Sequence, residues 1–325
     1  MSVTAGATVW GARLHETEDD DWFEYKVVAP VGNAGGAGAV FTLSPDTEPP
    51  LVGKFYNPEV RAGMASDREA ALRIIMPALH RDGLNQTLDF ASWPRRILFD
   101  LKEPPAADLH KHVIGFTMEM LVGTKSLNTL LGKDIDRKNL TRERTIHIAI
   151  TLADQLAKMH RHPWGFIFGD MSPMNIHITK DFSKVLFIDT DSFQFDNGAF
   201  DCKLSGLTPD YSSPGGRAAV TANRQMTATH DDFVLAILIY QLLMRDLGFE
   251  CHPFTLDGED PDDVIDRRHF PMDAGDTNNF MKDAYAQLPD DIREAFTHSF
   301  TKDTPVTALQ WIPLLTNYRR SLWRS

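Results

Sequence analysis

Cysteine is scarce in this sequence, and a membrane-length hydrophobic run is absent. The chain has 325 residues but only two cysteines, Cys202 and Cys251. They are too few for a disulfide framework and lack the Cys-x-x-Cys spacing of a zinc site. The longest nearly apolar run, Phe233 to Met244, is shorter than the ~20 residues that cross a bilayer and is followed by Arg245. We therefore expect a cytoplasmic protein in which this run is a buried helix.

The sequence also lacks an excess of positive charge and a secretory signal. Its 45 acidic residues against 33 lysines and arginines give a formal net charge of -12, the wrong sign for a protein that mainly neutralises nucleic-acid phosphates. The first residues have no basic start followed by an apolar core, and they become acidic at Asp19 to Asp21. We expect an ordinary globular protein with no nucleic-acid partner and no membrane partner.

Two parts of the chain differ in periodicity. Residues 25–121 contain short apolar runs separated by Gly, Pro and polar clusters, as strands do, and one segment of helical spacing that begins at a candidate cap, Ser66. From residue 122 onward the pattern is mostly helical, apart from a loop between Asp189 and about Thr229. The sequence predicts an N-terminal extension over 1–24, a small β-rich lobe over 25–121 and a larger, mostly α lobe over 122–325.

A glycine-rich segment, Val31 to Phe41, lies between two strand-like runs. This context differs from the strand-to-helix turn of a dinucleotide fold or a Walker loop. It suits a β-turn-β cover over phosphate, because Gly35, Gly36 and Gly38 let the backbone approach phosphate oxygens and adopt turns that a Cβ would forbid. A flexible hairpin explains the same glycines, so this segment alone does not decide the function.

A lysine, Lys54, stands inside the apolar strand pattern LVGKFY. An unpaired charge there is costly to bury, so an anionic partner is expected. Glu69 on the following helix is the natural partner, and such a pair would hold the ammonium against the phosphates of a nucleotide. The alternative is a lysine that reaches solvent from a strand edge.

The segment from Trp164 to Phe193 carries polar groups in the order that phosphoryl transfer requires. Asp170 precedes Asn175 in GDMSPMN, and the apolar run VLFI leads to Asp189. A carboxylate that orients a hydroxyl, an amide oxygen on a metal and a second carboxylate on that metal are the parts of such a site. Each residue alone is also a common turn former or strand-end acid. Their order after the glycine-rich segment and Lys54 favours the catalytic interpretation.

From Tyr25 to about Trp323 the sequence resembles the protein kinase-like superfamily, whose fold is α+β and bilobal. The segment TMEML resembles the hinge of that fold, with Met118 as gatekeeper, and Asp231 resembles the acid that braces the catalytic loop. The resemblance implies that Mg-ATP binds between the lobes and that ATP and Mg²⁺ are the cofactors. It implies these site residues: catalytic Asp170, Lys54 and Glu69; nucleotide-binding Gly35, Gly36, Gly38, Val40, Lys54, Met118, Glu119 and Leu121; metal-binding Asn175 and Asp189.

The chain departs from the kinase pattern at several positions. Gly169 replaces the arginine that grips a phosphorylated activation segment, Ser172 replaces a lysine, and Asp189-Thr190-Asp191 replaces Asp-Phe-Gly. Gly215 and Thr304 stand where the family has a paired glutamate and arginine, so both partners are missing together and no orphaned charge results. The lost arginine predicts activity that does not depend on phosphate at the activation-segment hydroxyls, which are Ser205, Thr208, Ser212 and Ser213.

The phrases SWP, VIGFTMEM, GDMSPMN and FIDTDSFQF resemble a bacterial kinase subfamily found beside metal-dependent phosphatases and von Willebrand A proteins, including those linked to tellurite resistance. This implies a protein serine/threonine kinase whose partners are a von Willebrand A-domain protein and a cognate phosphatase. Two alternatives stay open. One is a small-molecule phosphotransferase of the aminoglycoside or choline type, and the other is a pseudokinase that acts as a nucleotide-binding scaffold.

Two further groups of residues have a structural and a functional interpretation. His160 and His162 have a spacing that can bind zinc, but no cysteine or carboxylate cluster supports it, so a structural role is expected. Phe193, Phe195 and Phe200 could form a docking patch, but packing of the activation segment is the expected use.

Overall fold

The computed structural model describes residues 3–14, 21–32, 35–47, 49–132, 140–196, 198, 201–202, 207–246 and 252–323. Of the residues named above, Asp19, Phe200, Ser205 and Cys251 lie outside this described part. The chain divides into two compact units. Unit 1 comprises Met1–Val122 and Ile188–Asp191, and unit 2 comprises Gly123–Phe187 and Ser192–Ser325. Each unit is described by itself.

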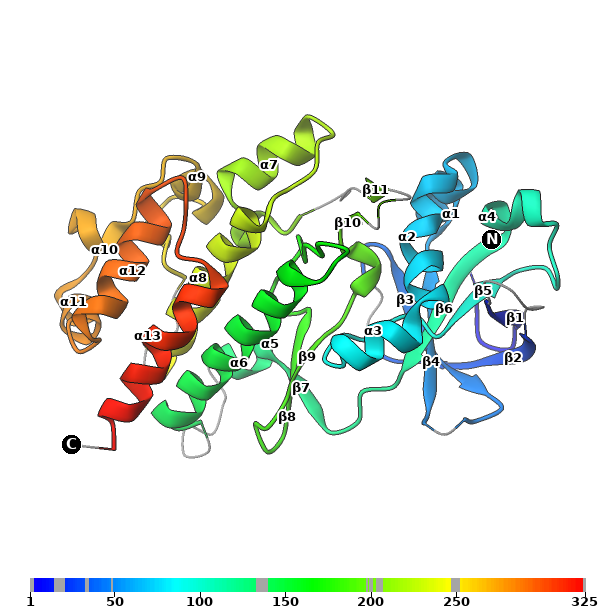
Figure 1. Cartoon of the computed structure of the whole chain (residues 1–325), viewed down its shortest axis with the longest axis horizontal. Coiled ribbons are helices and arrows are strands. Elements are labelled where there is room, and N and C mark those ends of the chain that lie inside the picture. Colours follow the sequence, from blue (N-terminus) through cyan, green and yellow to red (C-terminus); the bar gives the residue numbers. More distant parts are fainter. Residues whose placement is uncertain are drawn as a thin grey trace. The chain divides into compact units, whose positions relative to one another are not determined.

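Unit 1 is built on a closed antiparallel barrel with the strand order β1-β2-β3-β4-β6-β5 (Figure 1, blue to cyan). Its strands are β1 (Thr8–Arg13), β2 (Asp21–Pro30), β3 (Gly38–Ser44), β4 (Leu51–Tyr56), β5 (Arg96–Phe99) and β6 (Val113–Glu119). Strand β4 lies between β3 and β6 and is buried along its whole length. This placement puts Lys54 inside the barrel wall.

The expected extension over residues 1–24 is wrong for Thr8–Arg13. This segment pairs with β2 on one side and with β5 on the other, so it closes the barrel. Val9 and Ala12 are buried, and Gly11 lies so close to Tyr25 that an added Cβ would be 2.8 Å from the tyrosine ring. The run was too short and too rich in small residues to stand out as a strand by its periodicity.

The helix expected after β4 is α2 (Arg68–Leu79), and other helices flank it: α1 (Pro58–Ser66), α3 (Arg81–Thr87) and the short α4 (Leu109–His112). Ser66 is not the cap of α2. The N-cap is Asp67, whose carboxylate accepts a hydrogen bond from the backbone N–H of Glu69. Asn57 caps α1 in the same way through Val60, and Pro58 follows at the first helical position.

Unit 2 combines small sheets with helices (Figure 1, green to red). Its strands are β7 (Thr124–Ser126), β8 (Ile176–Thr179), β9 (Val185–Phe187), β10 (Phe195–Asp196) and β11 (Asp201–Cys202). Its helices are α5 (Leu127–Leu131), α6 (Arg142–Arg161), α7 (Pro214–Thr221), α8 (Ala228–Asp246), α9 (Pro261–Asp266), α10 (Pro271–Ala274), α11 (Asn279–Tyr285), α12 (Asp290–Thr301) and α13 (Ala308–Ser321). Short 3₁₀ turns are η1 (Ala106–Asp108), η2 (Thr190–Ser192) and η3 (Pro209–Tyr211).

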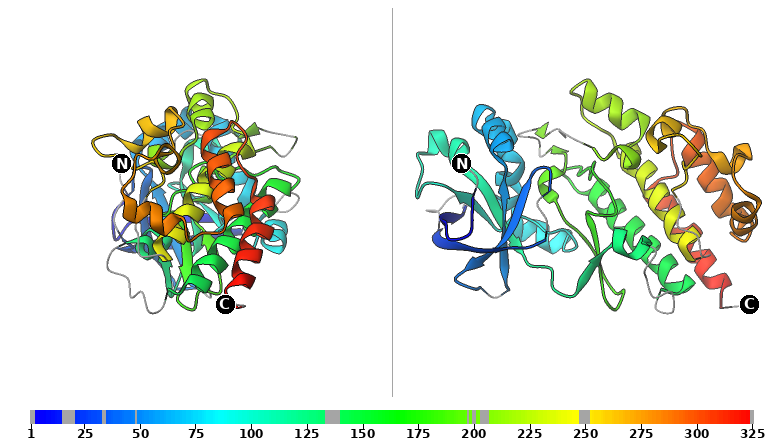
Figure 2. Two further views of the ribbon diagram at one scale, coloured as in Figure 1. Left: turned by 90° about the vertical axis from the view of Figure 1, so that its left-hand side faces the viewer. Right: turned by 180° about the vertical axis from the view of Figure 1, so that it is seen from behind.

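Helices α6, α8 and α13 run side by side in unit 2 (Figures 1 and 2). The run Phe233–Met244 lies inside α8, and its side chains are buried apart from a partly exposed Gln241, as the sequence predicted for a core helix. Among the described residues, no helix is both long enough and apolar enough to cross a membrane.

Helix α7 lies in the stretch that was expected to be a loop. Ser213 caps it by accepting a hydrogen bond from the N–H of Gly216, and Pro214 occupies the first helical position. Two glycines in its first turn lower the intrinsic helix propensity and hid the helix from periodicity. The cap and the proline were the signals that could have found it.

A buried carboxylate on α8 holds the start of α13. Asp232 is 5% exposed and accepts a 2.7 Å hydrogen bond from the backbone N–H of Ala308. Burial raises the pKa of Asp232 from 3.8 to about 6 and outweighs the opposing effect of that hydrogen bond. The folded protein therefore holds this proton more tightly than the unfolded chain, and the free energy of unfolding falls as the pH rises from about 4 to about 6.

We expect Asp232→Asn to become more stable relative to wild type as the pH is raised from about 5 to about 7.5, by roughly 1 kcal/mol. Asparagine keeps an oxygen for the Ala308 N–H but has no charge to desolvate. Thermal unfolding of both proteins at the two pH values measures this. An equal difference in stability at both pH values would contradict the assignment.

Candidate functional site

The glycine-rich segment of unit 1 is a turn between β2 and β3 that is tied to the end of β4. Gly35 donates its N–H to the carbonyl of Gly38 at 2.8 Å, which closes the turn. The side-chain amide of Asn57 donates to the carbonyl of Gly36 at 2.6 Å, and the Asn57 N–H donates to Ala37 at 2.9 Å. Asn57 was missed in the sequence, although an Asn-Pro pair directly after a strand is a turn signal.

Gly38 is required by close packing rather than by its dihedral angles. A Cβ at this position would lie 2.1 Å from the carbonyl oxygen of Phe55 on β4. Val40 follows on β3 and pairs in register with Lys54. The turn with Gly35 and Gly36 therefore begins directly beside the strand that carries the lysine. That these residues bind a nucleotide stays a prediction.

The partner of Lys54 is different from the one expected. Its ammonium donates to both carboxylate oxygens of Asp191, at 2.9 and 3.0 Å, and to Oδ1 of Asp189 at 3.1 Å. Glu69 is exposed near the start of α2 and makes no ion pair with Lys54. The predicted Lys54–Glu69 pair is therefore wrong. The general expectation of an anionic partner was correct, because the lysine is only 6% exposed.

The charge balance around Lys54 keeps it protonated. Burial lowers the pKa of the Lys54 ammonium, but Asp191 and Asp189 together outweigh burial and hold the pKa above its ordinary value of 10.5. The phenol of Tyr56 donates to Asp191 at 2.8 Å, and burial together with this carboxylate raises the pKa of Tyr56 well above its ordinary value. Lysine, tyrosine and aspartate thus form one buried network in unit 1.

Asp189 has a strained backbone at this network. Its φ of 58° lies in the left-handed region, which is uncommon for a residue with a Cβ and occurs at functional sites. The next residue, Thr190, donates its hydroxyl to the carbonyl of Ser92 at 2.9 Å and begins the 3₁₀ turn η2. Half-exposed, the Asp189 carboxylate offers the hard oxygen atoms that Mg²⁺ binds.

The predicted hinge is the end of β6 and the residues after it. Met118 pairs in register with Val52 and is partly buried against the core cluster that includes Phe116. Glu119 pairs with Leu51 and forms a 3.0 Å ion pair with Arg95, while Leu121 follows the strand as a partly exposed residue. The segment is the end of a strand that pairs with β4 and β5, and its contact with an adenine stays a prediction.

In unit 2, Asp170 and Asn175 lie together on one loop. The Asn175 amide donates to the backbone carbonyl of Asp170 at 2.9 Å and lies 3.4 Å from its carboxylate oxygen Oδ2. Asn175 is buried at 9% exposure, so its side-chain orientation is fixed by these contacts. The loop therefore presents the carboxylate of Asp170 from a fixed backbone.

Asp231 braces this loop, as the sequence predicted. Its two carboxylate oxygens accept the N–H groups of Phe168 at 2.8 Å and Gly169 at 2.9 Å, and His160 contacts it at 3.0 Å. Burial alone would lower the pKa of His160, but the hydrogen bond and the charge of Asp231 outweigh burial and hold this pKa above its ordinary value. The expected structural role of His160 is thus confirmed.

A second histidine, His230, links the same loop to α7. Its Nε2 lies 2.7 Å from the carbonyl oxygen of Gly169, and its Nδ1 lies 3.3 Å from the backbone nitrogen of Ser213. Nε2 therefore carries the proton and Nδ1 accepts. Burial lowers the pKa of His230, which favours this neutral ring. A Cβ on Gly216 would lie 2.1 Å from Nδ1, which explains the glycine in α7.

Thr208 contacts the predicted base directly. Its hydroxyl donates to Oδ1 of Asp170 at 2.6 Å, and its backbone N–H donates to the same oxygen at 2.9 Å. The sequence identified Thr208 only as one of several hydroxyls, because spacing along the chain does not show which hydroxyl faces the carboxylate.

The aromatic residues near this loop form a packed cluster. Phe193 is 0% and Phe195 is 1% exposed, and they contact Phe166, Phe168 and Trp164. The expected packing role is confirmed for these two phenylalanines.

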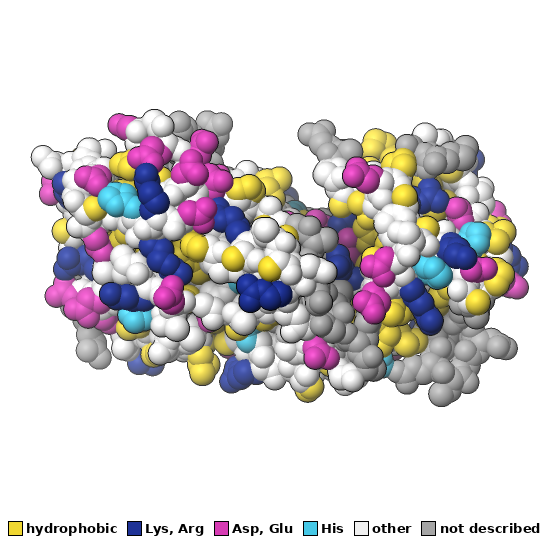
Figure 3. Space-filling view, turned by 90° about the horizontal axis from the view of Figure 1, so that it is seen from above, with side chains coloured by type: hydrophobic (Ala, Val, Ile, Leu, Met, Phe, Trp, Pro, Cys, Tyr) yellow, Lys and Arg dark blue, Asp and Glu magenta, His cyan; other side chains and the backbone are white. Residues whose placement is uncertain are grey.

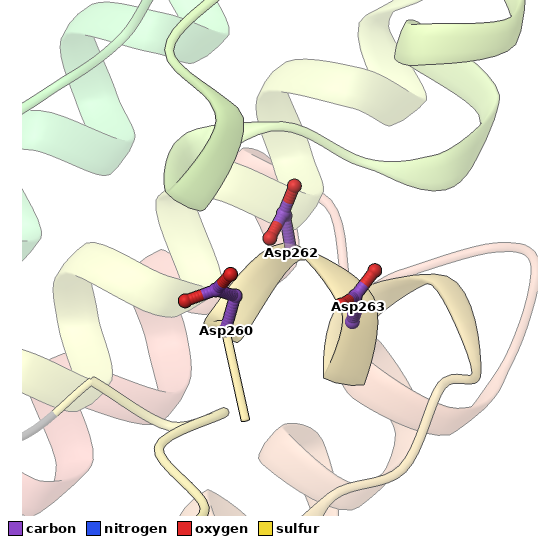
Figure 4. A group of neighbouring side chains, drawn as sticks. All are labelled: Asp260, Asp262 and Asp263. Carbon is purple, nitrogen blue, oxygen red and sulfur yellow. The ribbon is translucent and has the colours of Figure 1, made fainter. Parts of the chain in front are cut away.

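Three acids at the start of α9 lie close together: Asp260, Asp262 and Asp263 have carboxylate oxygens within 4.8 Å of one another (Figure 4). They are exposed or partly exposed, and acids are favourable at a helix N-terminus. A structural role is sufficient for them. On the face of unit 2 drawn in Figure 3, acidic and basic side chains are interspersed among the described residues.

Comparison with known proteins finds similar chains among curated proteins and among solved structures. No family model matches the chain. Among curated proteins, it is 25% identical over 304 residues to protein kinase YegI of Escherichia coli O157:H7, and 24% identical to protein kinase YegI of strain K12. These alignments cover 89% of this chain but 44% of each relative, so the chain spans less than half the length of the curated relatives it matches.

Among solved structures, the kinase domain of Mycobacterium tuberculosis PknI matches with a TM-score of 0.54 and 14% identity, covering 98% of this chain and all of that one. The kinase domain of a Toxoplasma gondii rhoptry antigen matches with a TM-score of 0.59 and 14% identity, covering 99% of this chain and 88% of that one. The strands and helices of both units agree with these likenesses. The chain therefore has the α+β fold of the protein kinase-like superfamily.

Proposed function

We propose that this chain is a Mg-ATP-dependent protein serine/threonine kinase, with Asp170 as the residue that orients the acceptor hydroxyl. The observation that carries the proposal is the 2.6 Å contact from the Thr208 hydroxyl to Oδ1 of Asp170. This contact supports the role of Asp170, because the carboxylate accepts a hydrogen bond from an aliphatic hydroxyl on an extended peptide segment. A threonine within a polypeptide is a closer analogue of a protein substrate than of an aminoglycoside or choline.

The residues have separate roles in this proposal. Lys54 would neutralise nucleotide phosphate, Asp189 and Asn175 would supply oxygen ligands for Mg²⁺, and Asp170 would accept the hydroxyl proton. The turn with Gly35, Gly36 and Gly38 would cover the phosphates, and the backbone of Glu119 and Leu121 would contact the adenine. Bound Mg²⁺ would offset the negative charge of the transferring phosphoryl group.

The partner assignment rests on sequence resemblance and belongs to the same proposal. The acceptor would be a protein, with a von Willebrand A-domain protein and a cognate metal-dependent phosphatase as candidate partners in the bacterial cytoplasm. Neither nucleic acid nor membrane is part of the proposed function. The net charge of -12 supports this choice, because it disfavours polyanionic partners.

Nucleotide binding is tested best at Asp189. We expect Asp189→Asn to reduce the rise in melting temperature caused by Mg-ATP, because a roughly tenfold loss of affinity removes about 1.4 kcal/mol of ligand stabilisation. Lys54→Met should reduce it too, but that variant also leaves buried Asp191 without its cation. Lys26→Met, at an exposed lysine on β2, is the matched control. Wild-type responses in both site variants would contradict the assignment.

Asp170 is expected to serve transfer rather than nucleotide binding. Asp170→Asn should keep its thermal response to Mg-ATP but lose phosphate transfer to protein by about two orders of magnitude or more, the effect of removing a positioned base. Asp154→Asn, at a half-exposed acid on α6, is the control. Undiminished transfer would refute this role. Nucleotide binding by wild type without any transfer would instead favour the pseudokinase scaffold.

Activity should not depend on activation-segment phosphate. Gly169 supplies no cation beside Asp170, and Arg217 is already bound to Asp266 and to the carbonyl of Asp262. Ser212 and Ser213 are 0% and 7% exposed, so their hydroxyls are inaccessible in this fold. Phosphatase-treated and untreated enzyme should therefore transfer phosphate at similar rates. A roughly tenfold or larger fall, about 1.4 kcal/mol, would contradict this expectation.

A further inference from the structure

The ammonium of Lys54 has two acidic neighbours that differ in their surroundings. Asp191 accepts from it through both oxygens, at 2.9 and 3.0 Å, and its side chain is 8% exposed. Asp189 accepts through one oxygen at 3.1 Å, and its side chain is 39% exposed. Asp191 is thus the more buried partner of the ammonium and the one that contacts it through both oxygens.

The carboxylate of Asp191 is itself oriented from β4. The phenol of Tyr56 donates to its Oδ2 at 2.8 Å, and Tyr56 is 6% exposed. Lys54 and Tyr56 are two residues apart on one strand, so their side chains leave the same face of the barrel wall. The rings of Tyr56 and Phe116 each lie 5.9 Å from the ammonium. This apolar packing keeps water from replacing the carboxylate.

The turn that carries Asp191 is anchored in unit 1. Thr190 is 1% exposed, and its hydroxyl bonds to the carbonyl of Ser92 at 2.9 Å. Asp189 and Asp191 therefore flank one fixed residue. Helix α2 contributes no acid to the network, because it buries its apolar residues Ala71, Ile74, Pro77 and Ala78 and leaves Glu69 exposed.

We propose that Asp191, oriented by Tyr56, is the positioning residue for Lys54 and that Glu69 has no part in this role. The inference deepens the proposed function and rests on it where it concerns phosphate. Asp191 holds the ammonium in place through both of its carboxylate oxygens. The second acid of Asp-Thr-Asp thus replaces a helix glutamate, and the lysine is positioned by the same turn that carries Asp189.

The first test locates the Lys54 ammonium without any nucleotide. Crystal structures of wild type, Asp191→Asn and Glu69→Gln are compared after superposition of the barrel strands. We expect the ammonium to leave its wild-type position in Asp191→Asn, because an amide offers one neutral oxygen in place of two charged ones. Glu69→Gln should match wild type.

The same superposition separates positioning from loss of structure. If the barrel strands overlay on those of wild type and Lys54 alone moves, the effect of Asp191→Asn is local. Tyr56→Phe keeps the carboxylate and removes only its donor, so Lys54 should stay nearer to its wild-type position than in Asp191→Asn. A Lys54 side chain that moves in Glu69→Gln but not in Asp191→Asn would overturn the proposal.

The second test measures phosphate transfer. We expect Asp191→Asn to lower kcat/KM for ATP at least about tenfold, equal to about 1.4 kcal/mol of transition-state stabilisation, and Glu69→Gln to stay within about twofold. The reverse order of effects would overturn the proposal. If wild type transfers no phosphate at all, the proposed function fails, while the variant structures still decide whether Asp191 positions Lys54.

Discussion

The buried ion pair between Lys54 and Asp191 is the interaction on which the candidate site of unit 1 depends. A lysine that is 6% exposed in the middle of a barrel strand would be costly without a carboxylate at hydrogen-bond distance. Asp191 supplies both oxygens, and Tyr56 fixes their orientation. The strained backbone of Asp189 is held in the same network, so one set of contacts sets both the lysine and the exposed carboxylate beside it.

In unit 2, a buried carboxylate is paired with backbone N–H groups and not with a lysine. The loop that carries Asp170 has N–H groups that would be unpaired in the interior, and Asp231 at the start of α8 accepts them. His230, which directly precedes Asp231 in the chain, contacts the carbonyl of Gly169 on the same loop. In both units, a buried charged side chain on a regular element therefore fixes a loop that carries a candidate site carboxylate.

Features set by short segments of sequence could be predicted, such as the loop with Asp170 and Asn175. Contacts between residues far apart in the sequence could not, such as that of Lys54 with Asp191. Order and spacing brought out Asp170 and Asn175, which do lie together on one loop, and Asp231, which does brace that loop. Their roles in catalysis and metal binding stay predictions. The partner of Lys54 could not be predicted in this way. Glu69 was the nearest acid on the expected helix, but the register of α2 places it in solvent, and Asp191 lies far along the chain.

The central claim is that this fold transfers phosphate from Mg-ATP to a serine or threonine of a protein. It is tested most directly by the intact mass of the chain after incubation with Mg-ATP, alone and with a candidate von Willebrand A-domain partner, followed by localisation of the modified residue. The account predicts added phosphate on a serine or threonine of the chain or of the partner, and none when Asp170→Asn replaces wild type. Unchanged masses of both proteins under conditions where Mg-ATP binds would contradict it.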